Sequence, residues 1–553
     1  MPDTPRNIPK GRALQDFLPL LPAEEKLRSA VREGEKCVIT DTRPECRTQK
    51  NTVRAEFLRF LALGGDAESP VHEKGINFTG AWVTGTLDLS GCTLPRRFGA
   101  VSCCFEQQLG FQDAHVCGPL DLSGSLISGL NGNRLLVDGD VFLCGNFICC
   151  GHINLIGVTI NGSLDCQAGV FLGDNKEDPK NKYSLSIERA LIKGSALFSK
   201  CNLANKGMNL HSAEIGGHLD LYKGDFSSQN GPSIQAEGLQ VNGFFRVKQL
   251  RKPLQGIDLT SCRVGRLEDD AGSWGSNLHL NGFVYENVAN DIENQAAARL
   301  VWLKKQVDAD YNNPISFKPQ PWKQLIRTLR RMGHDEDARQ VAIAYEQHRR
   351  KIGLITGWDK QFAHLLFGWL IGYGYRPLRL VYIMLAVWLG CGALYWSAAL
   401  NGVFAPSNPQ VFLHGSPLML RTLPQDKNAA SLVLQQDSYQ HCRPDYPFAG
   451  QPNQEEKFNN WYLCPQLAGE YTGFSPLAYS LDLLLPLVDL QQEHDWAPYV
   501  PTPQENWGDE LLAFSKYHWT RLLVWFEILF GWVASLLLVA VLSGLTNRDQ
   551  SDE

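Results

Sequence analysis

Val116-Cys-Gly-Pro-Leu-Asp-Leu122 is one copy of a short pattern, apolar-x-Gly-x-apolar-x-apolar, that recurs between Trp82 and about Tyr285. A fixed period in the twenties is typical of a solenoid, in which each repeat buries its apolar face only against the next. Alternating side chains around a glycine predict strands and turns rather than helices. We call the central residues the repeat glycines; they are Gly85, Gly118, Gly139, Gly162, Gly194, Gly217, Gly243 and Gly265.

The spacing of the repeat glycines predicts the size of one repeat. Five of the seven steps are 21 to 26 residues long, so we predict a mainly β solenoid, a parallel β-helix with coils of about 22 residues, over residues 76–287. The steps from Gly85 to Gly118 and from Gly162 to Gly194 are 33 and 32 residues long. Each predicts either an inserted loop or a degenerate coil, and the polar segment 173–182 is the candidate loop.

Two other folds also have regularly spaced turns, a β-sandwich and a leucine-rich horseshoe. The horseshoe needs a helix or a 3₁₀ segment in every repeat. The residues that follow the predicted strands, such as Ser90-Gly-Cys92 and Ser123-Gly-Ser125, are too short and too glycine-rich for a helix. We therefore prefer the parallel β-helix.

The cysteines are concentrated in this region. None of them forms a Cys-x-x-Cys pair, and no histidine spacing completes a zinc site, so we predict no metal and no cofactor. A free cysteine packs as a small apolar side chain and suits the interior of a solenoid. Unpaired thiols also indicate a reducing compartment. Of the 15 cysteines, those in or near the repeats are Cys92, Cys103, Cys104, Cys117, Cys144, Cys149, Cys150, Cys166, Cys201 and Cys262.

The regions on either side of the repeats have helical patterns. A solenoid needs caps, because its terminal coils expose unpaired backbone groups. Residues 1–75 predict a helical N-terminal cap with helices near 23–32 and 52–63, and the polar, proline-rich start lacks the apolar core of a signal peptide. Residues 288–352 predict a helical hairpin cap, with Gly333 between its two main helices.

Two segments are long and apolar enough to cross a bilayer, residues 378–400 and 522–545. Aromatic residues gather near their ends, as they do at membrane interfaces. Residues 353–377 include a shorter apolar stretch, which we expect to lie along the membrane surface. The chain length of 553 residues and the net charge of −6 fit several domains and give no indication of a nucleic-acid partner.

Charge near the two segments predicts their orientation. Basic residues precede the first segment and Arg548 follows the second, whereas residues 401–518 hold five Lys and Arg against thirteen Asp and Glu. The positive-inside rule then predicts a bacterial inner-membrane protein with both termini, the solenoid and the tail 546–553 in the cytoplasm. Residues 401–518 would form an extracytoplasmic domain, where Cys442 and Cys464 either pair as a disulfide or remain free thiols.

A third apolar segment, residues 474–490, lies between the two long ones. It is too short to cross a bilayer, and Pro486 would end or kink a helix there. The order of a span, a short apolar segment and a second span is similar to the pore module of tetrameric cation channels, although no potassium-type filter follows. Asp482, Asp489 and Glu527 are candidate membrane-depth carboxylates that could line a pore in an oligomer. The alternative is an interfacial helix with solvated or capping aspartates.

Several phrases along the chain resemble one family. They are Val53–Gly65, Pro70–Gly75, Gly80–Leu89, Pro319–Leu325, Gly333–Arg339, Gly372–Pro377 and Ser480–Leu490. Together they resemble bacterial, repeat-rich, two-pass membrane proteins that are sometimes labelled membrane-associated oxidoreductases. The resemblance covers nearly the whole chain but carries no catalytic residues with it.

The motifs favour a role other than catalysis. The sequence has no Walker A motif, no Gly-x-Ser-x-Gly elbow and no Gly-x-Gly-x-x-Gly after a strand. We predict a membrane-anchored binding, scaffold or sensor protein, whose solenoid binds a cytoplasmic protein or associates with itself in a homo-oligomer. The first alternative is an oligomeric ion-conducting protein, and the second is a membrane-associated oxidoreductase.

Overall fold

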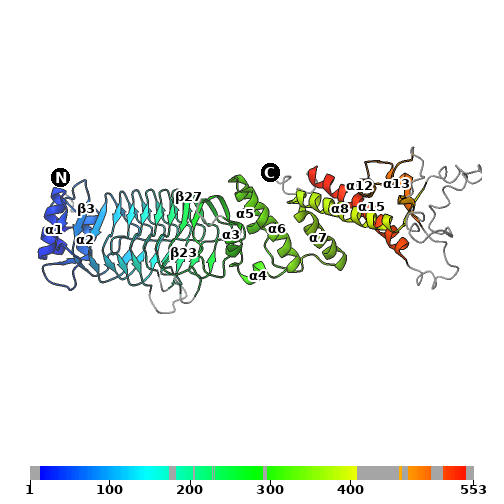
Figure 1. Ribbon diagram of the computed structural model, residues 1–553. Helices are drawn as coiled ribbons and strands as arrows, with labels where there is room; N and C mark the ends of the chain where they lie inside the picture. The colour runs from blue at the N-terminus through cyan, green and yellow to red at the C-terminus, as the bar shows by residue number, and fades with distance from the viewer. Residues whose placement is uncertain are drawn as a thin grey trace, which may run out of the picture. The chain divides into compact units, whose positions relative to one another are not determined.

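The computed structural model describes residues 13–173, 182–203, 206–226, 228, 231–289, 295–407, 460–463, 471–499 and 515–543. The chain divides into two compact units, Met1–Leu354 and Ile355–Glu553. The first unit contains the glycine repeats, and the second contains the long apolar segments. Figure 1 shows both units and labels their elements.

The first unit is a β-solenoid of about nine turns, which confirms the repeat fold predicted from the glycines. Its strands stack into parallel sheets of 17, 6 and 7 strands, seen as the ladder of arrows in Figure 1. The 17-stranded sheet contains β1 (Cys37–Val38), β3 (Ile76–Thr79), β5 (Thr93–Leu94), β6 (Phe98–Val101), β9 (His115–Val116), β10 (Leu120–Asp121), β13 (Leu136–Val137), β14 (Val141–Phe142), β17 (Thr159–Ile160), β18 (Leu164–Asp165), β21 (Leu191–Ile192), β22 (Ala196–Leu197), β24 (Glu214–Ile215), β25 (Leu219–Asp220), β27 (Gln240–Val247), β29 (Arg263–Asp269) and β30 (Val284–Val288).

The two smaller sheets form the other sides of the solenoid. The first contains β2 (Thr52–Arg54), β4 (Trp82–Thr84), β7 (Cys104–Phe105), β11 (Leu126–Ile127), β15 (Ile148–Cys149) and β19 (Val170–Phe171). The second contains β8 (Leu109–Gly110), β12 (Leu130–Asn131), β16 (Ile153–Asn154), β20 (Leu185–Ser186), β23 (Met208–Asn209), β26 (Ile234–Gln235) and β28 (Ile257–Asp258).

Most strands have only two residues, one pointing inward and one outward. Neighbouring coils pair in register, so that Val116 lies over Val137, and Val137 over Ile160. All three side chains are fully buried, and Ile192 continues the same stack. Burying one such side chain stabilises a protein by about 1.5–3 kcal/mol. The interior is therefore a set of aliphatic ladders, which explains why one apolar pattern recurs in every coil.

The repeat glycines from Gly118 onward form one column along the 17-stranded sheet. The amide of Gly194 donates to the carbonyl oxygen of Gly162 at 2.9 Å, and that of Gly217 to Gly194 at 2.8 Å. A Cβ on Gly162 would lie 2.8 Å from the backbone carbon of Gly139 in the preceding coil. Glycine recurs at this position because the neighbouring backbone leaves no room for a side chain.

The two long glycine steps have different causes. Gly162 and Gly194 stack directly, so that step is one coil with inserted residues, and 174–181 of the candidate loop lie outside the described residues. Gly85 instead follows β4 in the six-stranded sheet, with a backbone φ of +81°. The first long step therefore reflects a change of sheet, not a degenerate coil in the column.

The N-terminal cap combines helices with strands. The helices are η1 (Leu14–Phe17), α1 (Pro22–Glu33) and α2 (Ala55–Ala62). Within the range predicted as a helical cap, β1 and β2 already pair with β3 and β4 of the next coil. Glu24 of α1 is fully buried and forms an ion pair with Arg54 at the end of β2, with a 2.6 Å contact.

The other end of the solenoid is capped by α3 (Ala296–Leu303), α4 (Asp308–Tyr311), α5 (Gln320–Arg331) and α6 (Asp335–Lys351). Two α5 side chains bind the exposed edge of β30. Gln324 donates to the Tyr285 carbonyl oxygen at 2.8 Å, and Gln320 to that of Phe283 at 3.1 Å. These amides occupy backbone groups next to the last strand that would otherwise be unpaired.

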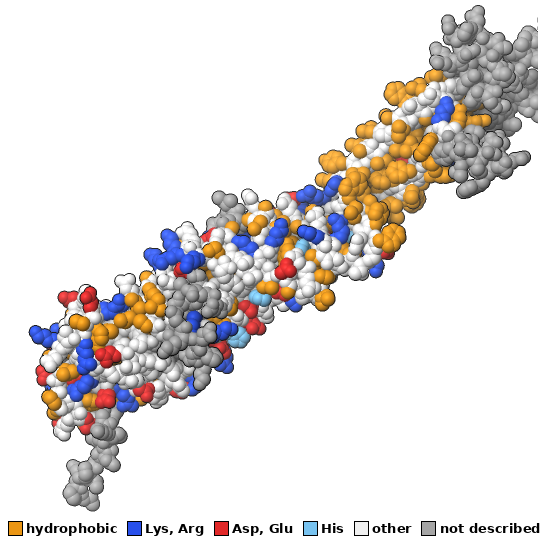
Figure 2. Space-filling model, turned by 90° about the horizontal axis from the view of Figure 1, so that it is seen from below, with side chains coloured by type: hydrophobic (Ala, Val, Ile, Leu, Met, Phe, Trp, Pro, Cys, Tyr) orange, Lys and Arg blue, Asp and Glu red, His pale blue; other side chains and the backbone are white. Residues whose placement is uncertain are grey.

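The second unit contains α7 (Trp358–Ile371), η3 (Gly372–Gly374), α8 (Pro377–Leu400), β31 (Phe404–Pro406), η6 (Trp461–Leu463), α12 (Pro476–Leu484), α13 (Gln492–Asp495), β32 (Trp496–Pro498) and α15 (Lys516–Leu542). Two of its helices, α8 and α15, are long and apolar enough to cross a membrane. Only 28% and 22% of their most apolar stretches are buried. Figure 2 shows the resulting apolar surface in orange.

Candidate functional site

Residues 475–493 form a hairpin, in which α12 leads away from Ser475 and the following residues return to it. The backbone amide of Ser475, just before α12, donates to the Gln492 side chain at 2.9 Å. Asp482 is buried in the hairpin, and its carboxylate accepts the backbone amides of Leu490 at 2.6 Å and Glu493 at 3.0 Å. Asp482 thus holds the returning segment, which is not a strand, against α12.

The hairpin contacts α8 and α15 near the middle of each helix. The Trp388 indole of α8 donates to the Leu477 carbonyl oxygen at 2.9 Å. Glycine permits the close packing on the other helix, because a Cβ on Gly531 of α15 would lie 2.2 Å from the carbonyl oxygen of Leu484. Leu484 also packs among apolar side chains of α7, α8 and α15.

Glu527 lies at this contact and is 0% exposed. One carboxyl oxygen is 2.5 Å from the Ser480 hydroxyl of α12, which also lies 3.0 Å from the Trp388 carbonyl oxygen. The buried hydroxyl of Tyr395 and the buried thiol of Cys391, both on α8, face the same carboxyl group. Polar side chains from α8 and α12 therefore converge on one buried carboxyl group of α15.

Asp489 has a third kind of environment. It is exposed at the tip of the hairpin, where its carboxylate accepts only the nearby Gln491 amide at 2.8 Å in the described part of the chain. Leu487, 94% exposed, and Val488 and Leu490 flank it. The three predicted carboxylates therefore differ: Glu527 is buried between helices, Asp482 is structural, and Asp489 is available to a partner. Cys442 and Cys464 lie outside the described residues.

The solenoid carries a column of outward polar side chains along its seven-stranded sheet. Strand pairing places Asn209, Gln235, Asp258 and His279 one above another on successive coils. The Gln235 amide donates to Asp258 at 3.0 Å. Repetition of polar groups at the spacing of strands, about 4.8 Å, presents a regular array of donors and acceptors.

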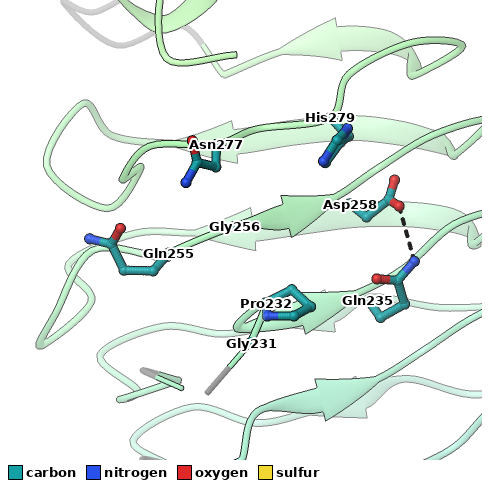
Figure 3. Close-up of a pocket in the computed structure, with 8 residues that line it drawn as sticks. All are labelled: Gly231, Pro232, Gln235, Gln255, Gly256, Asp258, Asn277 and His279. Carbon is teal, nitrogen blue, oxygen red and sulfur yellow. Dashed lines mark hydrogen bonds between the residues drawn. The ribbon is translucent and has the colours of Figure 1, made fainter. Parts of the chain in front are cut away.

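A shallow groove of about 340 Å³ opens on this column. Figure 3 shows its lining side chains projecting from neighbouring coils, and they comprise three amides, one carboxylate, one imidazole and one proline ring. Such a lining can recognise a polar ligand by hydrogen bonds. The residues that line it are Gly231, Pro232, Gln235, Gln255, Gly256, Asp258, Asn277 and His279. Sequence reasoning missed the groove, since its residues lie in three separate coils.

Most solenoid cysteines match the packing predicted for them. Cys103, Cys149 and Cys262 are buried, and burial raises the pKa of each thiol to about 12. These thiols stay protonated near neutral pH and are poor nucleophiles. Cys150 is exposed, and Cys117 is partly exposed beside a histidine.

Comparison of the chain with protein-family models, curated proteins and solved structures finds no match in any of the three.

Proposed function

We propose that the chain is a membrane-anchored binding protein. In this proposal α8 and α15 cross the bilayer, and the solenoid presents a rigid polar surface to a partner in the cytoplasm. The observation that carries the proposal is the exposure of the apolar side chains on both long helices.

The exposed side chains argue against a soluble bundle. Leu378, Tyr382 and Trp396 of α8 are more than half exposed, as are Leu529 and Leu536 of α15. Contiguous apolar patches larger than a few hundred Å² are rare on soluble monomers. At 1.5 Å per residue the helices are about 36 and 40 Å long, enough to cross a hydrocarbon layer of about 30 Å. A lipid environment accounts for both length and exposure.

Basic residues support the orientation. Arg376 and Arg379 lie at the start of α8, and Arg349, Arg350 and Lys351 end α6. An excess of such residues favours the cytoplasmic side, which supports a bacterial inner-membrane protein with a cytoplasmic solenoid. Since α12 contacts the middle of both long helices, residues 474–490 would enter the bilayer and return to the same side.

The polar groove supports binding as the role of the solenoid. Hydrogen bonds between parallel strands fix the backbone of each coil, so the residues of the groove are already ordered. Binding a partner there would lose less conformational entropy than binding it with a flexible loop. A protein segment with free backbone amides and carbonyls would match its amides, carboxylate and imidazole.

Two measurements test the proposal. The full-length chain should remain in the membrane fraction after alkaline carbonate extraction. A photo-crosslinking residue at Gln255, in the groove, should capture a partner protein that the same residue at Val38, an exposed position on β1, does not. Extraction into the carbonate supernatant would contradict the anchor, and equal capture from both positions would contradict the groove.

A second candidate function is ion conduction by an oligomer, and Asp489 favours it. A carboxylate exposed near membrane mid-depth costs several kcal/mol in lipid unless it faces water or a partner. Association of copies around the hairpins would cover Leu487 and Val488 and direct Asp489 into a lumen. Liposomes with the protein should then pass cations at a rate that Asp489→Asn lowers and Asp359→Asn, at the start of α7, does not. Ion-tight liposomes would contradict conduction.

A further inference from the structure

One flank of the solenoid brings together a thiol, an imidazole and a carboxylate. His115 and Cys117 lie on either side of the fully buried Val116, so both side chains point outward from β9. β13 in the next coil stacks on β9, and the Asp138 amide donates to the Val116 carbonyl oxygen at 3.0 Å. The register of the coils therefore places Asp138 directly beside Cys117.

The donor atoms are already close to the spacing of metal ligands. His115 Nε2 lies 2.8 Å from Asp138 Oδ2 and 3.7 Å from Cys117 Sγ, and all three ligand atoms lie within 4.8 Å of one another. A tetrahedral zinc ion with bonds of about 2.0–2.3 Å separates its ligand atoms by about 3.3–3.7 Å. The thiol and imidazole meet this spacing, and rotation of the exposed Asp138 side chain brings the carboxylate to it.

A neighbouring residue orients the carboxylate. The Asn161 amide, one coil further on, donates to Asp138 Oδ1 at 3.1 Å and leaves Oδ2 facing the histidine. Hydrogen bonds of this kind to a ligand are usual around bound metals and preserve the ligand geometry. The backbone of each coil is fixed by strands on both sides, so the positions of the three ligand residues are set before any ion arrives, and only the exposed Asp138 side chain has to turn.

We propose that His115, Cys117 and Asp138 bind one Zn²⁺ ion, with a fourth position open to water. A thiolate and an imidazole are borderline to soft ligands, which select zinc over magnesium or calcium. Binding transfers the thiol proton to solvent, and the thiolate and carboxylate then neutralise the charge of the ion. Three protein ligands and one open position are typical of zinc sites that act on a bound molecule.

Cobalt(II) is the probe, because its thiolate complexes absorb light and zinc displaces it. Chelator-treated full-length protein in detergent should bind one Co²⁺ per chain with a thiolate-to-cobalt charge-transfer band, and equimolar Zn²⁺ should abolish the band. Cys117→Ser removes a ligand, so it should abolish the band and weaken Zn²⁺ binding more than about 100-fold. Asn161→Ala removes only a residue that supports a ligand, so it should weaken Zn²⁺ binding by about 10–100-fold.

A matched control separates this site from other thiols. Cys150→Ser removes an exposed thiol on another sheet and should leave the band and the affinity unchanged. Asp138→Asn, which keeps an acceptor for Asn161, tests the carboxylate and should weaken Zn²⁺ binding while the circular dichroism spectrum stays that of the native chain. The proposal would be overturned by a charge-transfer band that survives Cys117→Ser. It would also be overturned if the native protein took up no Co²⁺, or bound Co²⁺ without the band.

Discussion

The ion pair between Asp269 and Arg299 should hold the C-terminal cap on the solenoid. The guanidinium of Arg299 in α3 donates both of its terminal amino groups to the Asp269 carboxylate of β29, at 2.7 and 2.8 Å. Their side chains are only 6% and 3% exposed, and the Trp274 indole donates to the same carboxylate at 2.7 Å. Arg299→Met would leave a buried carboxylate with one neutral donor.

The expected size of the effect follows from burial. Removing one partner of a buried pair costs about 3–5 kcal/mol, because the other charge is left without compensation. Since about 1.4 kcal/mol corresponds to a tenfold change, amide exchange in α3 and β29 should speed up about 10²–10³·⁵-fold. Hydrogen exchange with mass spectrometry on the full-length chain in detergent measures this directly.

Two variants control the experiment. Arg339→Met breaks an exposed pair with Glu336, which contributes about 0–1 kcal/mol, and should change exchange by less than tenfold. The double variant Asp269→Leu/Arg299→Met removes both charges and should recover most of the lost protection. If Arg299→Met and Arg339→Met behave alike, the cap does not depend on this pair.

Three further predictions follow from the local geometry. Gly531→Ala should lower the melting temperature of the solubilised chain, because its Cβ would meet a backbone oxygen at 2.2 Å, whereas Gly390→Ala, with nothing within 4 Å, should not. A thiol reagent at pH 8 should modify Cys150 in the folded protein but reach Cys149, whose pKa burial raises to about 12, only after unfolding. Burial lowers the pKa of His348, whose ring lies within hydrogen-bond distance of the Tyr311 carbonyl oxygen, so the folded cap favours the neutral imidazole. The contribution of His348 to the stability of the cap is therefore complete above its unfolded pKa of about 6.5 and declines as the pH falls below that value. Limited proteolysis should accordingly cleave the cap faster at pH 5.5 than at pH 7.5.

The fold was predictable because its signals are local and repeated. Glycine at each coil contact and an aliphatic residue at each inward position appear in the sequence at the period of the structure. The first long apolar segment, predicted at 378–400, agrees closely with α8, whereas the second, predicted at 522–545, begins six residues after the start of α15. The first strands were not predicted, because Cys37–Val38 and Thr52–Arg54 precede the first repeat glycine and lack the repeated pattern.

The candidate sites depend on which residues share a register, and this is not a local property. Cys117 and Asp138 are 21 residues apart and become neighbours only because a coil has that length at this point. Likewise, nothing near Glu527 in the sequence indicates Ser480, which a hairpin brings to it from another segment. The polar groove on the seven-stranded sheet was missed for the same reason, because its residues come from three different coils.

The side of the membrane on which the solenoid lies can be measured directly. Cys46 and Cys150 are exposed on the solenoid unit and can be labelled with a maleimide that does not cross membranes. We expect no labelling of these residues in intact spheroplasts and strong labelling after the membrane is permeabilised. The Cys46→Ser/Cys150→Ser variant shows how much of the signal comes from these two thiols. Labelling of equal strength before and after permeabilisation would contradict a cytoplasmic solenoid anchored by two membrane-spanning helices.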